Sequence, residues 1–356
     1  MSLFAAPNFL AMPAVGLDIS ADALRFIELA EKGESLVVSR FAKHNFPLGI
    51  IADGHVQDQK KLRDAIKVLA HEYRLSFANV SLPEEQAYLA NMRLPRVAPA
   101  EVRSAIEIHL EEYIPISSVE AIFDYVLVDE GANRHRDTMD VVVAALPRDI
   151  VNEYLDIFEG TGITPKAFEF ESQSMARAII PRGDKGTFLV ADVGKMVTDI
   201  FVVVNGIVQF SASLDIGGHL LTQAIERSLK VTYEEAEAMK IKSGLISGAK
   251  ERGLQEAMLP VIADLRARLM QHYSYWQTHH NEKAGGNIEL MYLTGGGANL
   301  KGMSEYLSIG LDVKVVIANP WVNVASFEQY IPPLPLRESH GYTAAIGLAL
   351  RNNIPE

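Results

Sequence analysis

An internal near-repeat restricts the fold of this 356-residue chain more than any other feature of its sequence. In the first copy, short apolar segments separated by polar turns predict strands at 15–19, 24–30 and 35–41. The same arrangement returns in the second copy at 188–193, 198–204 and 207–213. The pair Asn205-Gly206 before the last segment is a strong hairpin signal. A duplicated three-stranded meander predicts a two-lobed α/β protein.

The segments between and after the two meanders have the apolar spacing of amphipathic helices. Helices are predicted at 59–73, 100–113, 150–159, 219–229, 233–243, 257–282, 300–307 and 341–351, with further strands at 123–128, 140–146 and 288–293. This order predicts an N-terminal tail (1–14), a first lobe (15–80 and 163–185), a small α+β domain inserted into it (81–162), a second lobe (186–229 and 288–356) and a helical subdomain (230–287).

Composition narrows the class of protein. The net charge of −12 argues against a nucleic-acid-binding surface, and 48% hydrophobic residues are typical of a folded protein. The absence of cysteine excludes disulfides and thiolate metal sites. No apolar run is long enough for a membrane-spanning helix, and the apolar segment 1–13 lacks the basic residues of a signal peptide. We therefore expect a cytoplasmic protein whose tail is either loose or in contact with a membrane or partner.

Asp18 and Asp192 take matching places in the two meanders, each near the end of its first strand. Backbone N–H groups of a turn between paired strands can hold phosphate oxygens, and a carboxylate beside them can bind Mg²⁺ directly or through water. Alternatively, each aspartate merely caps a hairpin turn. The pattern alone leaves both interpretations open.

Gly295, Gly296 and Gly297 lie together between a predicted strand and a predicted helix. Such a loop allows a ligand to approach the backbone closely, and the helix N-terminus after it favours an anion, although it can also be a plain connection. Glu237 and Lys240 share one face of the helix 233–243, a spacing that also suits an ordinary surface ion pair. No Walker A, GxSxG, GxGxxG or zinc-binding motif occurs.

Together these features resemble the actin-like ATPase superfamily. Within it the chain is similar to the PilM family, the actin-like components of type IV pilus assembly, which are related in fold to FtsA. Four segments carry this narrower likeness: 15–29 (VGLDISADALRFIEL), 101–125 (EVRSAIEIHLEEYIPISSVEAIFDY), 214–225 (LDIGGHLLTQAI) and 292–303 (YLTGGGANLKGM). The resemblance covers about 15–351 and implies the actin-like fold.

The resemblance also implies a cleft for ATP or ADP with Mg²⁺, in which Asp18 and Asp192 are the candidate metal ligands. It places the other candidate nucleotide-binding residues in the two phosphate loops, the connecting segment, the helix beside the nucleoside and the adenosine loop: Ser20, Gly194, Lys195, Thr198, Gly217, Gly218, Glu237, Lys240, Gly295, Gly296, Gly297 and Asn299. Glu171 is the one candidate catalytic residue, although the Glu-Pro-x-Ala motif of related proteins is replaced here by Glu-Ser-Gln-Ser.

Both phosphate loops depart from the family pattern. The first loop is usually rich in glycine and serine, whereas here Asp22 adds a negative charge near any phosphate and an arginine, Arg25, replaces the usual lysine. In the second loop, Lys195 can neutralise phosphate, but Met196 crowds it. We therefore predict at most slow ATP hydrolysis, and a cleft retained for structure alone is the alternative.

The expected function is that of a cytoplasmic adaptor of the type IV pilus machine, associated with the inner membrane through a partner. The resemblance implies that such a protein captures the N-terminal peptide of a PilN-like inner-membrane protein in a groove between the first lobe and the inserted domain. Other pilus assembly proteins and further copies of the chain are additional candidate partners. The alternatives are a filament-forming protein like FtsA or MreB and a small-molecule kinase, for which no acceptor site is visible.

The helix predicted at 100–113 suggests where the peptide docks. We expect its apolar face, formed by Val102, Ile106, Leu110 and Tyr113, to be covered only partly by the rest of the protein. The glutamates on the same helix would favour basic residues that precede a membrane span. The alternative is an ordinary core with a solvated acidic face.

Overall fold

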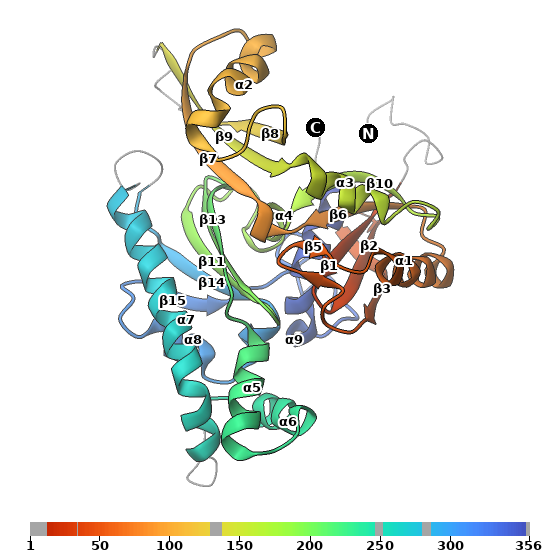
Figure 1. Ribbon diagram of the computed structural model, residues 1–356, viewed down its shortest axis with the longest axis vertical. Helices are drawn as coiled ribbons and strands as arrows, with labels where there is room; N and C mark the ends of the chain where they lie inside the picture. The colour runs from red at the N-terminus through yellow and green to blue at the C-terminus, as the bar shows by residue number, and fades with distance from the viewer. Residues whose placement is uncertain (1–12, 34, 129–136, 246–251, 280–285, 354–356) are drawn as a thin grey trace.

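Two five-stranded mixed sheets, one in each lobe, form the framework of the molecule (Figure 1). The computed structural model describes residues 13–33, 35–128, 137–245, 252–279 and 286–353, so most of the predicted tail lies outside the described residues. The first sheet has the order β10-β6-β1-β2-β3, with β1 (Val15–Ser20), β2 (Ala23–Lys32), β3 (Ser35–Asn45), β6 (Phe77–Leu82) and β10 (Thr164–Phe170). The second has the order β13-β12-β11-β14-β15, with β11 (Thr187–Val193), β12 (Thr198–Val204), β13 (Ile207–Leu214), β14 (Leu290–Thr294) and β15 (Lys314–Ile317).

The duplicated meander and the two-lobed α/β architecture are confirmed. In each lobe the first strand of the meander pairs antiparallel with the second and parallel with a later strand, β1 with β6 and β11 with β14. Asn205 and Gly206 have φ angles of 52° and 80°, which is the conformation of a tight hairpin turn of the type that follows the twist of its strands. This turn fixes the register of β12 against β13.

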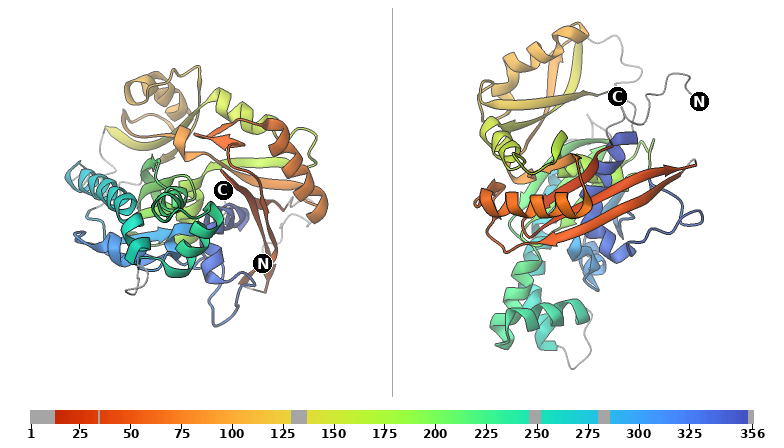
Figure 2. Two further views of the ribbon diagram at one scale, coloured as in Figure 1. Left: turned by 60° about the horizontal axis from the view of Figure 1, so that its bottom comes forward. Right: turned by 90° about the vertical axis from the view of Figure 1, so that its right-hand side faces the viewer.

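Helices cover both sheets. They are α1 (Gln59–Tyr73), α2 (Val102–Tyr113), α3 (Arg148–Asp156), α4 (Glu171–Ile179), α5 (Gly218–Leu229), α6 (Tyr233–Ser243), α7 (Arg252–His279), α8 (Met303–Ser308), α9 (Leu336–Ser339) and α10 (Thr343–Leu350). The bounds predicted for α1 and α6 agree with the structure because strong caps delimit them: Asp58 accepts a hydrogen bond from Lys61 N at the start of α1, and Thr232 caps α6. In Figure 2, α5 and α6 lie at the end of the molecule opposite α2.

A separate three-stranded sheet carries α2 (Figures 1 and 2). It has the order β7-β9-β8, with β7 (Tyr88–Pro95), β9 (Thr138–Pro147) and β8 (Ala121–Leu127). The predicted inserted domain 81–162 also includes α3, whose buried side chains pack into the core of the first lobe. The insert also contacts the second lobe, where Asn91 Nδ2 donates to the carbonyl of Gln209 at 2.7 Å.

The expectation that α2 needs a partner to cover its apolar face is wrong. Val102, Ile106 and Leu110 are buried against the three-stranded sheet and form a core with residues of β7, β8 and β9. Of the four residues of that face, Tyr113 alone is exposed. The periodicity correctly indicated one apolar face, but the insert's own sheet covers it.

Two helices, α4 and α10, lie at the junction between the lobes. They pack closely because the small residues Ser174 and Gly347 face each other. A Cβ atom on Gly347 of α10 would overlap the backbone carbonyl of Ser174 in α4, and one on Gly16 of β1 would overlap that of Ala345. Buried apolar residues of both sheets, among them Ile27 and Phe201, meet these helices in one shared core. The lobes are therefore joined by a tightly packed support below the cleft.

Candidate functional site

A cleft of about 800 Å³ lies between the two lobes and is lined by residues from both. Such a volume is typical of a small-molecule or cofactor site. Most of the predicted site residues line it: Asp18, Ser20, Glu171, Asp192, Gly194, Lys195, Gly218, Glu237, Lys240, Gly295, Gly296, Gly297 and Asn299. Thr198 and Gly217 do not line the cleft. They contact the backbone of the second loop and of the segment that follows β13.

The turn between β1 and β2 contributes the first set of polar groups. Asp18 is buried, and its Oδ1 accepts a hydrogen bond from Ser81 Oγ at 3.2 Å. Arg25 lies beside this carboxylate, with Nη1 3.6 Å from Asp18 Oδ2, and it also donates to Ser20 Oγ at 2.6 Å. Burial raises the pKa of Asp18, and the positive charge of Arg25 partly opposes that rise. The first loop thus holds its carboxylate and serine in fixed positions.

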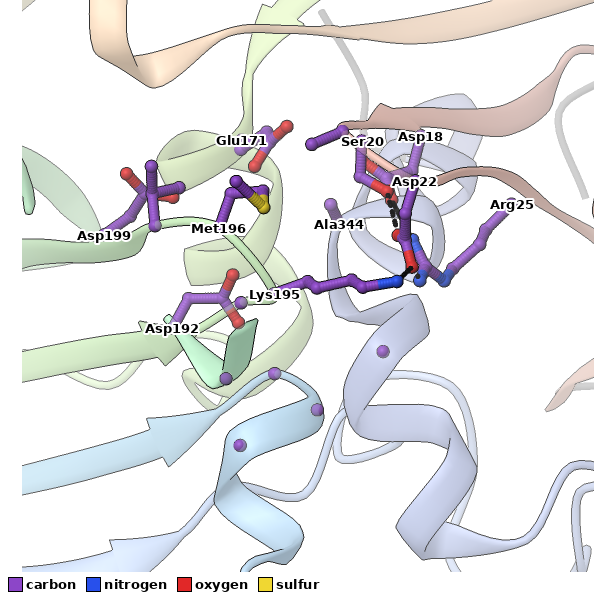
Figure 3. A pocket seen from close by; sticks show the side chains of 18 of the residues that line it. Asp18, Ser20, Asp22, Arg25, Glu171, Asp192, Lys195, Met196, Asp199 and Ala344 are labelled. Atoms are coloured by element: carbon purple, nitrogen blue, oxygen red, sulfur yellow. Dashed lines mark hydrogen bonds and ion pairs between the residues drawn. The ribbon is translucent and has the colours of Figure 1, made fainter. Parts of the chain in front are cut away.

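Lys195 of the second loop crosses the cleft to the first loop (Figure 3). Its Nζ lies 3.3 Å from Asp22 Oδ2, and Arg25 Nη2 lies 3.4 Å from Asp22 Oδ1. Burial tends to raise the pKa of Asp22, but Arg25 and Lys195 outweigh it and hold this pKa below its ordinary value. Asp22 of the first loop and Lys195 of the second loop therefore pair with each other across the cleft.

Asp192 lies at the end of β11 on the opposite wall. Burial, followed by the charge of Asp18, raises the pKa of Asp192 to about 7. The glycine loop packs directly against this region: a Cβ on Gly295, which has a φ of +79°, would overlap Asp192 Oδ1, and one on Gly297 would overlap Val193. A Cβ on Gly296 would meet nothing within 4 Å, so this glycine borders the open cleft.

The connecting segment is held by contacts of its backbone. Thr198 Oγ1 donates to the carbonyl of Ile216 at 2.5 Å, and a Cβ on Gly217 would lie 2.5 Å from the carbonyl oxygen of Lys195. Only glycine therefore allows the start of α5 to approach the second loop this closely. These two residues shape the loop rather than face the cleft.

Lys240 of α6 is engaged with neighbouring groups. Its Nζ donates to the Gly218 carbonyl at 2.8 Å, to Thr222 Oγ1 at 2.7 Å and to Glu237 Oε2 at 2.7 Å. Burial lowers the pKa of Lys240, although Glu237 opposes the shift. The predicted ion pair between Glu237 and Lys240 is therefore present. The bonds of Lys240 to Gly218 and Thr222 connect α6 to the N-terminal part of α5.

Asn299 lies between the glycine loop and the segment before α10. Its Nδ2 donates to the carbonyl of Arg337 at 2.7 Å, and its Oδ1 is 3.1 Å from His340 Nδ1. The second nitrogen of His340, Nε2, lies 3.1 Å from the carbonyl of Ala318. This arrangement closes the end of the cleft next to Gly295–Gly297.

Two acidic residues lie at the floor of the cleft: Glu171, which belongs to the predicted set, and Asp199, which does not. Glu171, the first residue of α4, faces Asp192 together with Asp199 of β12, and one carboxylate oxygen of each lies within 4.8 Å of the others (Figure 3). Burial, followed by neighbouring carboxylates, raises the pKa of Glu171 and of Asp199 well above the ordinary range. The sequence analysis missed Asp199. The available signal was a charged residue inside the otherwise apolar strand β12.

A second hollow, of about 690 Å³, lies between the inserted sheet and the two lobes. We call it the insert groove. It is lined by β8 and β9 of the insert, by β10 and α4 of the first lobe, and by the β12–β13 turn of the second: Asp124, Tyr125, Val126, Val142, Ala144, Glu169, Gln173, Ala176, Arg177, and 205–208 among others. Arg177 forms an ion pair with Glu169 at its floor. The groove carries both signs of charge, with Arg182 and Lys185 on its rim beside Asp184.

Within the described residues, no helix combines the length and the apolar character that crossing a bilayer requires.

Comparison with known proteins places this architecture in a family. A solved PilM-PilN type IV pilus biogenesis complex contains a chain 25% identical to this one, with a TM-score of 0.80 over 96% of this chain and 99% of that one. The actin-like protein MreB5 of Spiroplasma citri, solved with bound ADP, matches with a TM-score of 0.52 at 11% identity over 87% of this chain and 92% of its own. This second likeness shows the actin-like fold alone.

Sequence comparison points the same way. The cell division protein FtsA of Neisseria meningitidis serogroup B is 29% identical over 112 residues, which span 31% of this chain and only 27% of FtsA. A family model described as type IV pilus assembly protein PilM matches residues 16–353, which is nearly the whole chain. The protein therefore belongs to the PilM family of type IV pilus assembly proteins.

Proposed function

We propose that this protein is an actin-like adaptor of type IV pilus assembly that holds the cytoplasmic N-terminal peptide of a PilN-like inner-membrane protein. The observation that carries the proposal is the likeness to a PilM-PilN complex across almost the full length of both chains. Binding of such a peptide would keep the protein at the cytoplasmic face of the inner membrane. Other pilus assembly proteins would then bind to surfaces outside the groove.

The insert groove is the peptide site that the geometry supports best. Its volume of about 690 Å³ suits an extended peptide segment, and its walls are formed by residues of both lobes and of the insert. Among the described residues β8 is the last strand in the order β7-β9-β8, so no described strand pairs with its outer edge, at which a peptide can add backbone hydrogen bonds. Val126 of β8 lines the groove and is 46% exposed, which provides an apolar contact that the fold itself leaves uncovered.

The interlobe cleft fits ATP or ADP with Mg²⁺, and the open space over Gly296 supports this assignment. In this proposal the turns at Ser20 and Gly194 hold phosphate oxygens, Lys195 and Arg25 neutralise their charge, and the glycine loop lies against the adenosine. Asp18 and Asp192 would orient Mg²⁺, which neutralises phosphate charge when bound. Lys195 can neutralise a phosphate only if it leaves Asp22. We therefore expect nucleotide binding to change the closure of the lobes and the affinity for the peptide. We expect ATP hydrolysis far below the median enzyme rate of about 10 s⁻¹.

Calorimetry with a synthetic N-terminal peptide of a PilN-like inner-membrane protein tests the proposal. We expect Val126→Asp to weaken binding at least about tenfold, since it places a charge in the apolar part of the groove. Ile108→Asp is the matched control: Ile108 belongs to the same insert and is 76% exposed on α2, but it does not line the groove. Equal loss of binding in both variants, or none in either, would exclude the insert groove.

A further inference from the structure

The sequence contains a single Asn-Gly pair, Asn205-Gly206, and this pair forms the turn between β12 and β13. Both residues are exposed, with φ angles of 52° and 80°. Because the two strands pair as far as Val204 and Ile207, the turn consists of these two residues alone. Asparagine tolerates this conformation and glycine adopts it readily, so the pair suits the hairpin. The same pair also has a chemical reactivity that the hairpin does not require.

The side chain of an asparagine can react with the backbone nitrogen of the residue that follows it. After this nitrogen loses its proton, it attacks Cγ of the asparagine, a new C–N bond closes a five-membered succinimide ring, and ammonia leaves. Water then opens the ring at either carbonyl and yields aspartate or isoaspartate. An amide is thus exchanged for a carboxylate without oxidation or reduction. Glycine in the second position hinders the attack least, because it has no side chain.

The structure leaves both reacting groups of this turn free. Within the described part of the chain, neither the side chain of Asn205 nor the backbone N–H of Gly206 takes part in a hydrogen bond. A Cβ atom added to Gly206 would meet nothing within 4 Å, so there is open space beside the reacting bond. The backbone N–H of Asn205 donates to the carbonyl of Gly186 at 3.3 Å, which anchors the turn before the reacting bond only.

A second turn of this kind is restrained by its surroundings. Asp53-Gly54, between β4 (Ile51–Ala52) and β5 (His55–Val56), also has two positive φ angles, and an aspartate can close the same ring with loss of water. Gln86 Nε2 donates to the carbonyl of Asp53 at 2.8 Å, and Gly54 is buried, with Gln86 Cγ 2.9 Å from the place of a Cβ. Among the described residues no such contact covers the turn between β12 and β13, so the two turns can be compared within one chain.

We propose that Asn205 is a site of spontaneous deamidation, and that the reaction alters one wall of the insert groove. Residues 205–208 line this groove. The product carries a negative charge close to Lys185, whose neighbour Gly186 accepts the hydrogen bond from the turn. Isoaspartate also lengthens the backbone of the turn by one carbon, which is incompatible with the pairing register that a two-residue turn imposes on β12 and β13. The effect on the partner peptide rests on the proposed function, whereas the deamidation does not.

Peptide mapping by mass spectrometry, after the full-length protein has aged in mildly alkaline buffer, tests the modification. We expect Asn205 to deamidate at least about tenfold faster than Asn91 or Asn323, a difference of about 1.4 kcal/mol in activation free energy. The side chains of both reference residues donate hydrogen bonds to backbone carbonyls. An Asn205 that stays intact while either reference residue deamidates would overturn the inference.

Asn205→Asp provides a matched comparison between the two turns, because both then contain Asp-Gly. In this variant, isoaspartate should form at position 205 at least about tenfold faster than at Asp53, since contacts with Gln86 restrain only the second turn. Equal rates at the two positions would show that the surroundings of the turn do not control the reaction, which contradicts the argument from structure.

Calorimetry with the N-terminal peptide of a PilN-like protein tests the effect on the groove. Asn205→Gly is the control, because Gly-Gly fits the same turn and cannot deamidate. Fresh wild type and fresh variant should bind alike, whereas the isoaspartate form isolated from aged wild type should bind at least about fivefold more weakly than the aged variant. Equal affinity of these two aged proteins would overturn the proposed effect on the groove. Absence of binding by fresh protein would instead contradict the adaptor function, and peptide mapping would still decide whether Asn205 deamidates.

Discussion

Lys195 and Asp22 join the two lobes across the mouth of the cleft, with Lys195 Nζ 3.3 Å from Asp22 Oδ2. The two residues come from different loops, and together they form one ion pair. Lys195 is 40% exposed, so the pair contributes at most about 1 kcal/mol to the free energy of unfolding. Its main effect is electrostatic. Because Asp22 pairs with the ammonium group of Lys195, that group is not available to neutralise a phosphate.

Removing the charge of Asp22 should therefore raise the affinity for nucleotide, whereas removing the charge of Lys195 should lower it. Asp22→Asn frees Lys195 and removes a negative charge, so we expect Mg-ADP to bind about fivefold more tightly, which corresponds to about 1 kcal/mol. Lys195→Gln should weaken binding by a similar factor. Titration with a fluorescent ADP analogue measures both. A shift of both variants in the same direction would show that the pair does not compete with phosphate.

The glycine loop offers a test of which surface faces the ligand. Gly296→Ala should leave the thermal unfolding temperature unchanged, because its Cβ meets nothing within 4 Å, but it should weaken Mg-ADP binding by filling ligand space. Gly297→Ala should instead destabilise the fold by about 1–3 kcal/mol, since its Cβ overlaps Val193. If Gly296→Ala binds nucleotide as well as the wild type does, the ligand does not lie against this loop.

The close approach of α10 to α4 can be tested at one position. Gly347→Ala should lower the free energy of unfolding by at least about 1–3 kcal/mol, because the added methyl group overlaps the carbonyl of Ser174. The helical control is Gly253→Ala in α7, where the new Cβ would lie 3.6 Å from Leu229 Cδ2 and alanine favours the helix by up to about 1 kcal/mol. Urea unfolding of both variants distinguishes the effects, and similar stabilities would contradict the packing described at the lobe junction.

Glu84 should make the stability of the protein depend on pH. This glutamate is buried, its Oε1 accepts from Ser172 Oγ at 2.9 Å, and burial raises its pKa above the ordinary value of 4.5 despite these hydrogen bonds. Because the folded state then binds the proton more tightly than the unfolded state, this contribution is complete below about pH 4.5 and is lost as pH rises through the folded-state pKa.

Glu84→Gln isolates that contribution, since glutamine keeps an oxygen acceptor for Ser172 but cannot ionise. We expect the free energy of unfolding of the wild type to fall more steeply with rising pH than that of the variant. Urea titrations at a series of pH values provide the comparison. Parallel curves would mean that Glu84 has the same pKa in the folded and unfolded states.

Local signals explain how much of the fold could be predicted. The hairpin at Asn205-Gly206 and the caps at Asp58 and Thr232 depend only on neighbouring residues, so the meanders and helices α1 and α6 follow from the sequence. The burial of the α2 face depends on how the flanking strands β7, β8 and β9 pair into a sheet and on which side of that sheet the helix packs. Periodicity shows that a face is apolar, but it does not show what covers it.

The same distinction applies to the cleft. Asp18, Asp192 and the glycine loop were identified because repetition and consecutive glycines mark them in the sequence. Asp199 was missed because it lies in a mainly apolar strand, and it meets Glu171 only when β12 faces α4. The pairing of Asp22 with Lys195 also requires the two lobes to meet, since the residues lie 173 positions apart.

Hydrogen–deuterium exchange with and without the N-terminal peptide of the PilN-like partner tests the central claim most directly. If the peptide occupies the insert groove, amides of β8 (Ala121–Leu127) and of the turn at Asn205-Gly206 should exchange more slowly when the peptide is bound, because both border that groove. Amides on the exposed side of α2 should not change. Protection confined to α2 or to the interlobe cleft, with β8 unaffected, would contradict the account.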